Sequence, residues 1–499
     1  MFIASVLFTI FVIITAVYVF FKKKYSYWKD RGIECIEPVI PYGNTKPSFT
    51  NKSAIGEWVA EIYQTMKAKN VRHAGCYFLT SPIYFPIDLD LIKQIMQNDF
   101  VHFTDHRTFY NEKIDPLSAN LFALQGQRWR DLRVKLTPTF TSGKMKLMFP
   151  IMTEIAEELI KTLQVESRLG PIEVKDISAR FTTDVIGNCA FGIECNSLKD
   201  PNTEFRTKGS RIFGLTRLEM VLILINFTFP NIMKRLGGRL IPKDTADFFW
   251  DVIKTTTDYR IKNNVRRNDA LQLLIDMMDN GSQDNDATLT FSELAAQAFV
   301  FFVGGFETSS TLMCFALFEL SLNEDVQNRL RKEVIEELKR NNGKITYESL
   351  FEMRYLDMVI NETLRKYPPL PVLTRTCTKD YKVPNSDLLI KKDIDVFIST
   401  KGIHYDPEYY PDPQKFDPTR FTEENKNKRH NFAFLPFGEG PRICIGLRFG
   451  VMQAKIGLAS LIANFKFKLN PKTELPLKLD PRNFLIGILG GVWIDVESV

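Results

Sequence analysis

Residues 437–446 read Phe-Gly-Glu-Gly-Pro-Arg-Ile-Cys-Ile-Gly and hold one cysteine, Cys444. Gly438 and Gly440 lie just upstream, and glycine allows the positive φ angles through which a loop can turn several peptide N–H groups toward one atom. An apolar series that is typical of a buried helix begins at Leu447. The stretch therefore predicts a cysteine loop at a helix N-terminus, where the helix dipole and free N–H groups favour a thiolate.

The spacing Phe437-x-x-Gly440-x-Arg442-x-Cys444-x-Gly446 resembles the haem-binding signature of the cytochromes P-450, which are haem-thiolate monooxygenases. This resemblance implies a haem b whose iron takes Cys444 as its axial ligand and which is bound by Phe437, Gly440, Arg442 and Gly446. It also implies the cytochrome P-450 fold, mainly α with small β-sheets, in a single large domain. A lone buried cysteine is the alternative interpretation. Covalent c-type haem is not indicated, because the sequence has no Cys-x-x-Cys-His stretch.

Composition bounds the class of protein. A chain of 499 residues would allow about two to four domains by length alone. With 44% hydrophobic residues and 40 phenylalanines, we expect a large aromatic interior. The net charge of +6 is too small to indicate nucleic-acid binding. Seven widely spaced cysteines, an odd number, predict a reduced body that faces the cytosol.

The first 21 residues contain no charged side chain and are followed by three lysines. At ~1.5 Å per residue this run would form a helix ~30 Å long, the thickness of the hydrocarbon core of a bilayer. We expect residues 1–21 to be a transmembrane anchor, 22–44 a basic flank and hinge, and 45–499 the haem-thiolate monooxygenase domain in the cytosol. A cleaved secretory signal is the alternative, although no basic segment precedes the run.

A long helix is predicted from Thr290 to beyond Phe318. Thr290 and Glu293 match a capping box, and the residues after them are apolar on most faces, which predicts burial. The middle of this helix nonetheless carries Gly304 and Gly305, each of which costs ~1 kcal/mol relative to Ala. A cost of this kind in a core helix suggests a function for the segment.

Glu307 and Thr308 follow these glycines, and a buried carboxylate is costly unless it is paired. The segment resembles the oxygen-activation motif of the family, Ala/Gly-Gly-x-Asp/Glu-Thr-Thr/Ser. The resemblance implies that Gly304 and Gly305 leave room for O2 beside the haem. It also implies two catalytic residues: Thr308 hydrogen-bonds the bound oxygen, and Glu307 helps to relay protons. A tolerated glycine pair with a glutamate that reaches solvent is the alternative.

Trp129 and Arg133 lie four residues apart on a predicted helix, so both side chains can reach one carboxylate. They resemble the Trp-x-x-x-Arg motif of the family, which implies that they hold a haem propionate. The resemblance places Arg375 near a propionate as well. Without the family motif, Trp129 and Arg133 would be read as a pair on a surface helix.

Glu362 and Arg365 lie three residues apart, a spacing that is usually found on solvated helix faces. Arg420 belongs to the stretch Phe-Asp-Pro-Thr-Arg-Phe at 416–421. The resemblance joins these three residues into a Glu–Arg–Arg lock behind the haem. Their expected role is structural.

The resemblance assigns apolar residues from several segments to the substrate pocket: Phe109, Tyr110, Phe122, Phe301, Val372, Leu373, Phe484 and Leu485. For the first two, a surface loop is the alternative. The apolar segment 215–230 is too short to span a bilayer, and we expect it to dip into the membrane surface near the substrate entrance, with burial in the core as the alternative. Residues 276–286 are expected to form a polar loop.

The connecting sequence Leu136-Thr-Pro-Thr-Phe-Thr-Ser-Gly-Lys-Met resembles insect microsomal members associated with foreign compounds and plant toxins. This implies a single-pass protein of the endoplasmic reticulum membrane that oxidises lipophilic small molecules such as xenobiotics, insecticides or endogenous lipids. No Gly-x-Gly-x-x-Gly fingerprint stands in a strand–turn–helix context, so electrons from NADPH are expected through a separate NADPH-cytochrome reductase. Cytochrome b5 is a further expected partner, and Arg128, Arg130 and Lys135 are candidate docking residues.

Two other functions are compatible with a haem-thiolate site. One is an isomerase or dehydratase that rearranges a peroxide without NADPH, and the presence of both Glu307 and Thr308 argues against it. The other is a non-catalytic, haem-bearing protein that binds lipophiles. Consumption of NADPH that depends on substrate would separate both from a monooxygenase.

Overall fold

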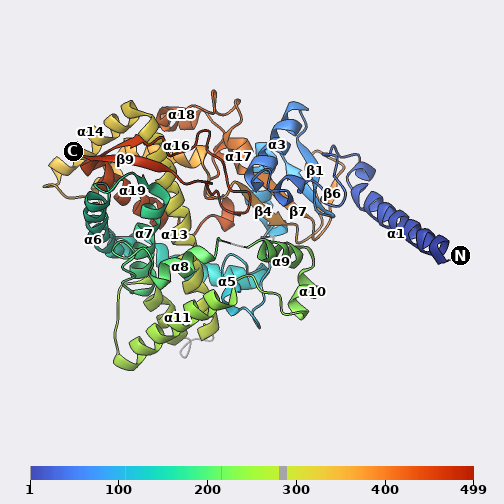
Figure 1. Cartoon of the computed structure of the whole chain (residues 1–499), viewed down its shortest axis with the longest axis horizontal. Coiled ribbons are helices and arrows are strands. Elements are labelled where there is room, and N and C mark those ends of the chain that lie inside the picture. Colours follow the sequence, from blue (N-terminus) through green and yellow to red (C-terminus); the bar gives the residue numbers. More distant parts are fainter. Residues whose placement is uncertain (1, 107, 215, 280–288) are drawn as a thin grey trace.

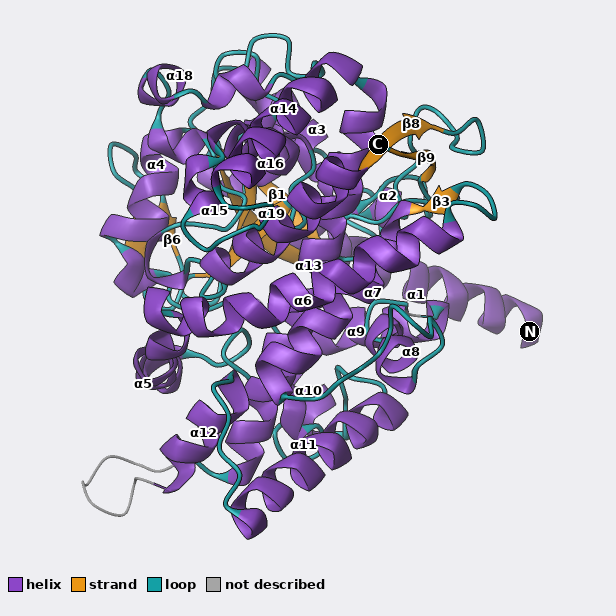
Figure 2. Cartoon of the chain, turned by 90° about the vertical axis from the view of Figure 1, so that its left-hand side faces the viewer, coloured by secondary structure: helices purple, strands orange, loops and turns teal. Residues whose placement is uncertain are grey.

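The computed structural model describes residues 2–106, 108–214, 216–279 and 289–499. The fold is mainly α-helical with small sheets, as expected (Figure 1, Figure 2). One helix ends at Asp279, so the polar loop expected over 276–286 begins as a helix, and its part from residue 280 onward lies outside the described residues. The α-helices are α1 (Phe2–Tyr25), α2 (Lys46–Phe49), α3 (Ile55–Ala68), α4 (Leu89–Lys93), α5 (Gly126–Leu136), α6 (Ser142–Glu166), α7 (Val174–Ile186), α8 (Glu204–Arg211), α9 (Arg217–Thr228), α10 (Pro230–Arg235), α11 (Lys243–Asn263), α12 (Ala270–Asp279), α13 (Phe291–Leu322), α14 (Glu324–Arg340), α15 (Ser349–Glu352), α16 (Arg354–Lys366), α17 (Thr400–His404), α18 (Glu423–Asn427) and α19 (Leu447–Asn464).

The strands of the described residues form three small sheets. A four-stranded sheet has the order β1-β2-β7-β4, in which β2 and β7 are parallel and the other pairs antiparallel. A three-stranded sheet has the order β3-β9-β8, and β5 pairs with β6. The strands are β1 (His73–Phe78), β2 (Ser81–Pro86), β3 (Ile172–Glu173), β4 (Val372–Thr376), β5 (Tyr381–Lys382), β6 (Leu389–Ile390), β7 (Asp395–Ser399), β8 (Phe465–Leu469) and β9 (Trp493–Ser498).

Helix α13 runs through the larger apolar cluster, together with α6, α7 and α19. It begins with the predicted capping box, because the Thr290 hydroxyl accepts from the Glu293 N–H and the Glu293 side chain reaches back to the Thr290 N–H. Close packing on α7 requires a glycine at Gly305, where an added Cβ would stand 2.6 Å from Ile186. A second cluster is built on β1, β2, β7 and α3, and Met358 and Phe434 pack against both clusters.

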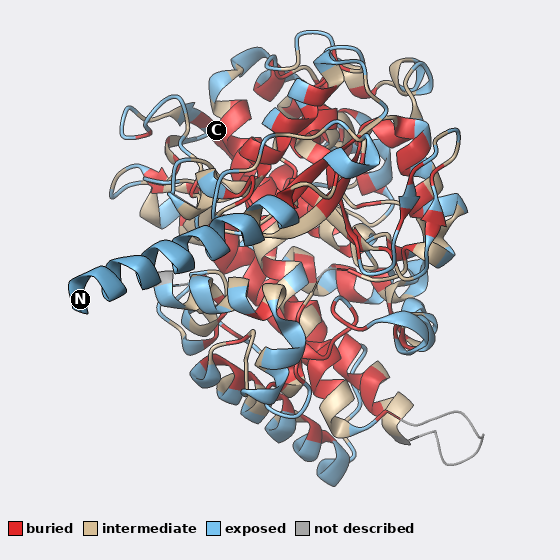
Figure 3. Ribbon diagram, turned by 90° about the vertical axis from the view of Figure 1, so that its right-hand side faces the viewer, coloured by how far each residue is buried: buried red, intermediate tan, exposed pale blue. Residues whose placement is uncertain are grey.

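Helix α1 has the opposite surroundings. Its residues from Phe2 to Phe20 are exposed, and Figure 3 shows it projecting from the body of the protein. By length and composition it is apolar enough to cross a membrane. Its last residue, Tyr25, and nearby Trp28 are buried in the β1 cluster, where the Trp28 indole donates to the Cys76 carbonyl at 3.0 Å. The segment expected as a hinge is therefore packed on the sheet from Tyr25 onward.

Candidate active site

A cavity of about 300 Å³ lies between α13, the cysteine loop, α5 and β4. Its wall is mostly apolar, apart from a few basic side chains, the Cys444 thiol and the hydroxyl residues Thr139, Thr308 and Ser309. Segments far apart in the sequence therefore meet at one place, as the resemblance predicted. The expected site residues found on this wall are Phe122, Trp129, Arg133, Phe301, Gly304, Gly305, Thr308, Leu373, Arg375, Phe437, Arg442, Cys444 and Gly446.

The cysteine loop has the predicted architecture. The Cys444 N–H donates to the Phe437 carbonyl at 3.0 Å, and Gly446 is the N-cap of α19. Gly440 has a φ of +72°, and a Cβ there would stand 1.9 Å from the Met96 carbonyl oxygen. Gly440 therefore does not line the cavity as expected, because its role is to let the loop pack against the backbone at Met96.

The thiol of Cys444 is exposed toward the cavity. Burial raises its pKa, whereas a hydrogen bond from the Gly446 N–H and the positive charge of Arg133 lower it. A thiolate is favoured here once a metal cation binds it, since a cation replaces the lost solvation of the charge. The residues thus fit a haem iron above the helix N-terminus.

Basic side chains gather on the wall, among them Arg375, Arg442 and His106. Arg375 is 2% exposed, and its Nε has no hydrogen-bond partner among the described residues. Burial lowers the pKa of Arg375 to about 10, and burial with the nearby Arg375 charge lowers that of Arg442 to about 9. Burial and both arginines also hold the pKa of His106 well below its usual range. Buried basic groups whose pKa values are lowered by burial, and for Arg442 and His106 also by neighbouring cations, fit an anionic partner such as the propionates of haem.

Arg442 also joins the cysteine loop to the segment before α5. Its guanidinium donates to the carbonyls of Thr104 at 2.8 Å, Leu121 at 3.1 Å and Leu124 at 2.7 Å. It lies 4.0 Å from the centroid of the Trp129 ring. Much of the hydrogen-bonding capacity of Arg442 is therefore used to hold backbone segments together. Its place in the motif does not reveal this structural role.

Alternation along β4 decides which of its residues reach the cavity. Leu373 and Arg375 lie on the wall, whereas Val372, one residue earlier, is buried on the other face of the strand. Successive side chains of a strand point to opposite faces, so both members of the expected pair Val372 and Leu373 cannot line the same pocket. The substrate role expected for Val372 is corrected accordingly.

Four other expected substrate residues lie off this wall. Phe109 is buried, and the neighbouring Tyr110 ring instead receives the Lys234 ammonium 4.1 Å from its centroid. Phe484 is 53% exposed at the tip of the turn after residue 480, and Leu485 is buried within that turn. The turn does approach the site, through the hydrogen bond from the Ile486 N–H to the Pro369 carbonyl. It presents other side chains than those expected.

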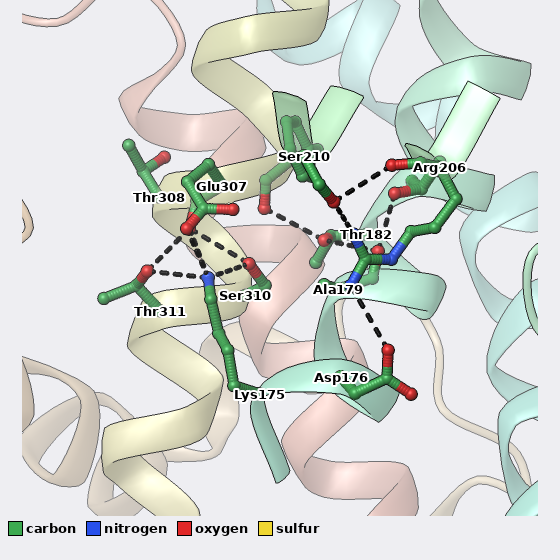
Figure 4. Close-up of polar contacts among 12 residues, drawn as sticks. Lys175, Asp176, Ala179, Thr182, Arg206, Ser210, Glu307, Thr308, Ser310 and Thr311 are labelled. Carbon is green, nitrogen blue, oxygen red and sulfur yellow. Dashed lines mark hydrogen bonds and ion pairs between the residues drawn. The ribbon is translucent and has the colours of Figure 1, made fainter. Parts of the chain in front are cut away.

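Helix α13 divides its polar residues between two sides. The Thr308 hydroxyl lies on the cavity wall and donates to the Gly304 carbonyl at 2.6 Å. The Glu307 carboxylate points away toward α7, where it pairs with the Lys175 ammonium at 2.9 Å (Figure 4). A Cβ added at Gly304 would meet no described atom within 4 Å, so the open space beside the helix belongs to Gly304. Gly305 serves the packing on α7.

The Glu–Arg–Arg set lies together as expected. Glu362 and Arg365 form a bidentate pair at 2.7 and 2.8 Å, and both are fully buried. Arg420 reaches Glu362 at 3.5 Å. Arg365 also donates to the His404 carbonyl, while the His404 Nε2 accepts from the Leu435 N–H at 2.9 Å. This connects the lock to the start of the cysteine loop, so its role is structural in the described contacts.

Several residues of the wall have no signal in the sequence. His106 lines the cavity and stacks near Phe122 with ring centroids 4.6 Å apart. Gly438, with a φ of +71°, lines it as well, although it was not among the expected site residues. A glycine with positive φ was foreseeable in this loop, but its orientation depends on the packing of the loop against Met96.

Comparison with known proteins agrees with this geometry. The sequence model of the cytochrome P-450 family matches residues 41–493. The chain is 46% identical to the probable cytochrome P-450 6a13 of Drosophila melanogaster, over 99% of both chains. It is 42% identical to cytochrome P-450 6k1 of Blattella germanica, over 96% of this chain and 94% of the relative. Matches of this extent, around a cysteine loop of the expected form, show that the chain belongs to the cytochrome P-450 family of haem-thiolate monooxygenases.

Proposed function

We propose that this monooxygenase is anchored in the endoplasmic reticulum membrane, with its catalytic domain in the cytosol, and that it oxidises lipophilic small molecules. Foreign compounds such as plant toxins are the class that we favour. The observation that carries the proposal is the cavity itself, in which the Cys444 thiol, basic side chains that include the incompletely partnered Arg375, and a few hydroxyl residues stand in an otherwise apolar wall. An apolar wall selects ligands by the hydrophobic effect.

The residues of the wall would hold the haem from two directions. Cys444 would supply the thiolate that binds the iron, and Arg375, Arg133, Arg442 and Trp129 would hold the propionates. When bound, haem supplies the iron at which O2 is activated with electrons from the reductase. In the net reaction one oxygen atom enters the substrate, and the other leaves as water after taking two protons and two electrons.

The remaining wall residues would bind substrate and handle protons. Phe122, Phe301 and Leu373 exclude water and hold an apolar substrate. Thr308 and Ser309 are the hydroxyl residues of α13 on the cavity wall, and we assign the final transfer of a proton to the Thr308 Oγ1. Glu307 stands on the opposite side of the helix, with a side chain 18% exposed, where it can exchange protons with solvent. Proton transfer by a positioned group contributes ~10²–10⁴ in rate.

Replacement of Cys444 tests the proposal most directly. In Cys444→Ala we expect the reduced carbonyl complex to lose its red-shifted thiolate spectrum. In Cys444→His we expect haem to be retained with little activity, because a neutral imidazole donates much less electron density. A red-shifted spectrum in Cys444→Ala would contradict the assignment. In wild type with added reductase, absence of substrate-dependent NADPH consumption would instead favour the isomerase or the lipophile binder.

Electron donors are proposed to dock beside the cysteine loop, at α5. Arg128 is exposed but paired with Glu112 at 3.1 Å, and Lys135 is half-buried, so we choose the exposed Arg130 among the three candidate cations. We expect Arg130→Glu to raise the KM for the reductase, and for cytochrome b5 if it uses the same surface, with kcat at saturating donor unchanged. An unchanged KM for both donors would place docking elsewhere.

A second membrane contact is proposed at α9 and α10. Their exposed apolar side chains are Leu218, Val221, Leu222, Ile225, Phe229 and Ile232, with Leu236 just after α10. Phe227, within the segment expected to dip into the bilayer, is only half-exposed. An apolar surface of this kind on a protein with an N-terminal anchor is suited to the bilayer interface.

A further inference from the structure

Three consecutive carbonyl groups of α13, beside the cavity, accept hydrogen bonds from side chains of other helices. Gln453 of α19 donates to the Gly305 carbonyl at 3.1 Å. Thr182 of α7 donates to the Phe306 carbonyl at 2.9 Å. Lys175, also of α7, donates to the Glu307 carbonyl at 3.2 Å (Figure 4).

Two of the three donors are fully buried, whereas the Lys175 side chain is 29% exposed. Thr182 and Gln453 are fully buried, and the Gln453 Oε1 has no partner among the described residues. A valine or a leucine would fill such positions without the cost of desolvating a polar group. The carbonyl bonds offset this cost, and they come from helices on different sides of α13.

The geometry of α7 fits a common purpose. Lys175, Thr182 and Ile186 are spaced by seven and four residues, so they lie on one face of the helix. On that face Ile186 fills the space left by Gly305, while the two polar residues bond the next two carbonyls. Successive carbonyls of a helix point about 100° apart around its axis, so bonds to three of them oppose both rotation and sliding of the turn.

We propose that Lys175, Thr182 and Gln453 are positioning residues that hold the turn Gly304–Thr308, and that they thereby fix where the Thr308 hydroxyl stands on the cavity wall. Thr308 depends directly on this turn, because its hydroxyl bonds the Gly304 carbonyl at 2.6 Å. Lys175 has a second effect, since it also bonds the Glu307 carboxylate, Ser310 and Thr311 and keeps the acid on the α7 side. The expected effect on catalysis rests on the proposed role of Thr308. The inference that these side chains hold the turn Gly304–Thr308 in place does not.

Neighbouring threonines of α7 provide a matched experiment. Thr183 is as fully buried as Thr182, but its hydroxyl bonds the Ala179 carbonyl of its own helix at 2.7 Å. Thr182→Val and Thr183→Val therefore remove the same group from adjacent positions, and only the first releases α13. Thr182→Ser keeps the hydroxyl and should behave as wild type.

The first measurement is hydrogen–deuterium exchange of the full-length holoenzyme in detergent. We expect amide exchange in residues 305–312 to rise roughly three- to tenfold in Thr182→Val, the range that corresponds to one hydrogen bond. It should stay at the wild-type level in Thr183→Val. Gln453→Met, which removes the donor from α19, should raise exchange in the same segment. Equal exchange in the two valine variants would overturn the proposal.

The second measurement is the ratio of product formed to NADPH consumed. We expect the ratio to fall at least twofold in Thr182→Val and to recover in Thr182→Ser, with Thr183→Val unchanged. A wild-type ratio in Thr182→Val, despite faster exchange, would overturn the catalytic part. Thr308→Ala distinguishes the two proposals: if it also leaves the ratio unchanged, the proposed role of Thr308 has failed, and the exchange result still decides whether the turn is held as inferred.

Discussion

Helices α1 and α13 are both long and apolar enough to cross a membrane, yet they occupy opposite environments. α1 is exposed along its apolar length (Figure 3), whereas most of α13 is buried inside the protein. Their polar residues show the difference. In α13, Glu307 pairs with Lys175, and Glu319 pairs with Lys366 at 2.6 Å. In α1, the Thr9 hydroxyl bonds the Ser5 carbonyl of the same helix.

The apolar composition of a helix therefore indicates only that it is shielded from water. The hydrogen-bond and ion-pair partners of its polar side chains indicate whether lipid or protein surrounds it. A charged group in hydrocarbon is costly, so a lipid-facing helix carries polar groups that it can satisfy by itself. A core helix can carry carboxylates, because other helices provide cations. The following variants either make the same substitution in both helices or change only the membrane contact or only the protein interior.

A buried charge should separate the helices most strongly. Ala316 of α13 is fully buried, and Ala16 of α1 is exposed. We expect Ala316→Asp to cost more than ~4 kcal/mol, a large part of the stability of a domain, and to abolish the red-shifted carbonyl spectrum. Ala16→Asp should leave that spectrum intact and weaken membrane insertion by ~3 kcal/mol, measured by alkaline extraction. Normal holoenzyme in Ala316→Asp would contradict the burial of α13.

Loss of one hydroxyl gives the next largest contrast. Thr308 and Thr9 each bond the carbonyl four residues earlier in their own helix. We expect Thr308→Ala to retain haem and substrate binding, to consume NADPH and to release hydrogen peroxide, with product per NADPH reduced about tenfold or more. Thr308→Ser should recover part of the coupling, and Thr9→Ala should have no effect. Glu307→Gln should slow turnover instead. The ratios of product to NADPH and to peroxide measure these outcomes.

Removal of α1 tests whether it is the whole membrane contact. We expect a protein without residues 2–21 to retain partial association with vesicles, through α9 and α10. Adding Leu222→Gln and Phe229→Gln, at side chains 43% and 53% exposed, should then lower vesicle binding about tenfold or more. The control pair Leu322→Gln and Phe351→Gln, at similar exposure (46% and 61%), should not. Complete solubility after the deletion alone would argue against the second contact.

Mild acid should affect the catalytic domain and leave α1 unchanged, because α1 contains no histidine. Burial and the charge of Arg365 lower the pKa of His404 to about 3. Between this value and the unfolded pKa of about 6.5, only the unfolded state binds the proton, so stability falls as pH falls. We expect a loss of about 1.4 kcal/mol from this group at pH 5.5, measured by urea unfolding. His404→Gln keeps a donor and an acceptor without titrating, so it should lose correspondingly less.

Local sequence predicted the features of the site that short segments determine. The cysteine loop, the capping box of α13 and the pairing of Glu362 with Arg365 all depend on residues within a few positions of one another. The direction in which a side chain points was harder to predict from the sequence. Val372 and Leu373 could not be distinguished without the register of β4, and the role of Gly440 depends on Met96, more than 300 residues away.

Contacts between distant segments explain the other differences. Glu307 faces away from the cavity because Lys175, 132 residues earlier, binds it there. Trp28 packs against the sheet because Gly75 leaves room for its indole. A Cβ at Gly75 would stand 2.2 Å from the ring. Neither partner is marked by a motif. The family resemblance supplied the identity of most wall residues, and packing decided which of them reach the wall.

The burial of Tyr25 and Trp28 sets how far the catalytic domain can stand from the bilayer. Only the four residues 21–24 separate exposed Phe20 from buried Tyr25, and all of them belong to α1. Five helical steps rise ~7.5 Å, and even a fully extended chain would reach only ~17 Å. With α1 in the membrane, the β1 side of the domain would therefore be held close to the lipid headgroups, which leaves little room for another protein between that side and the bilayer.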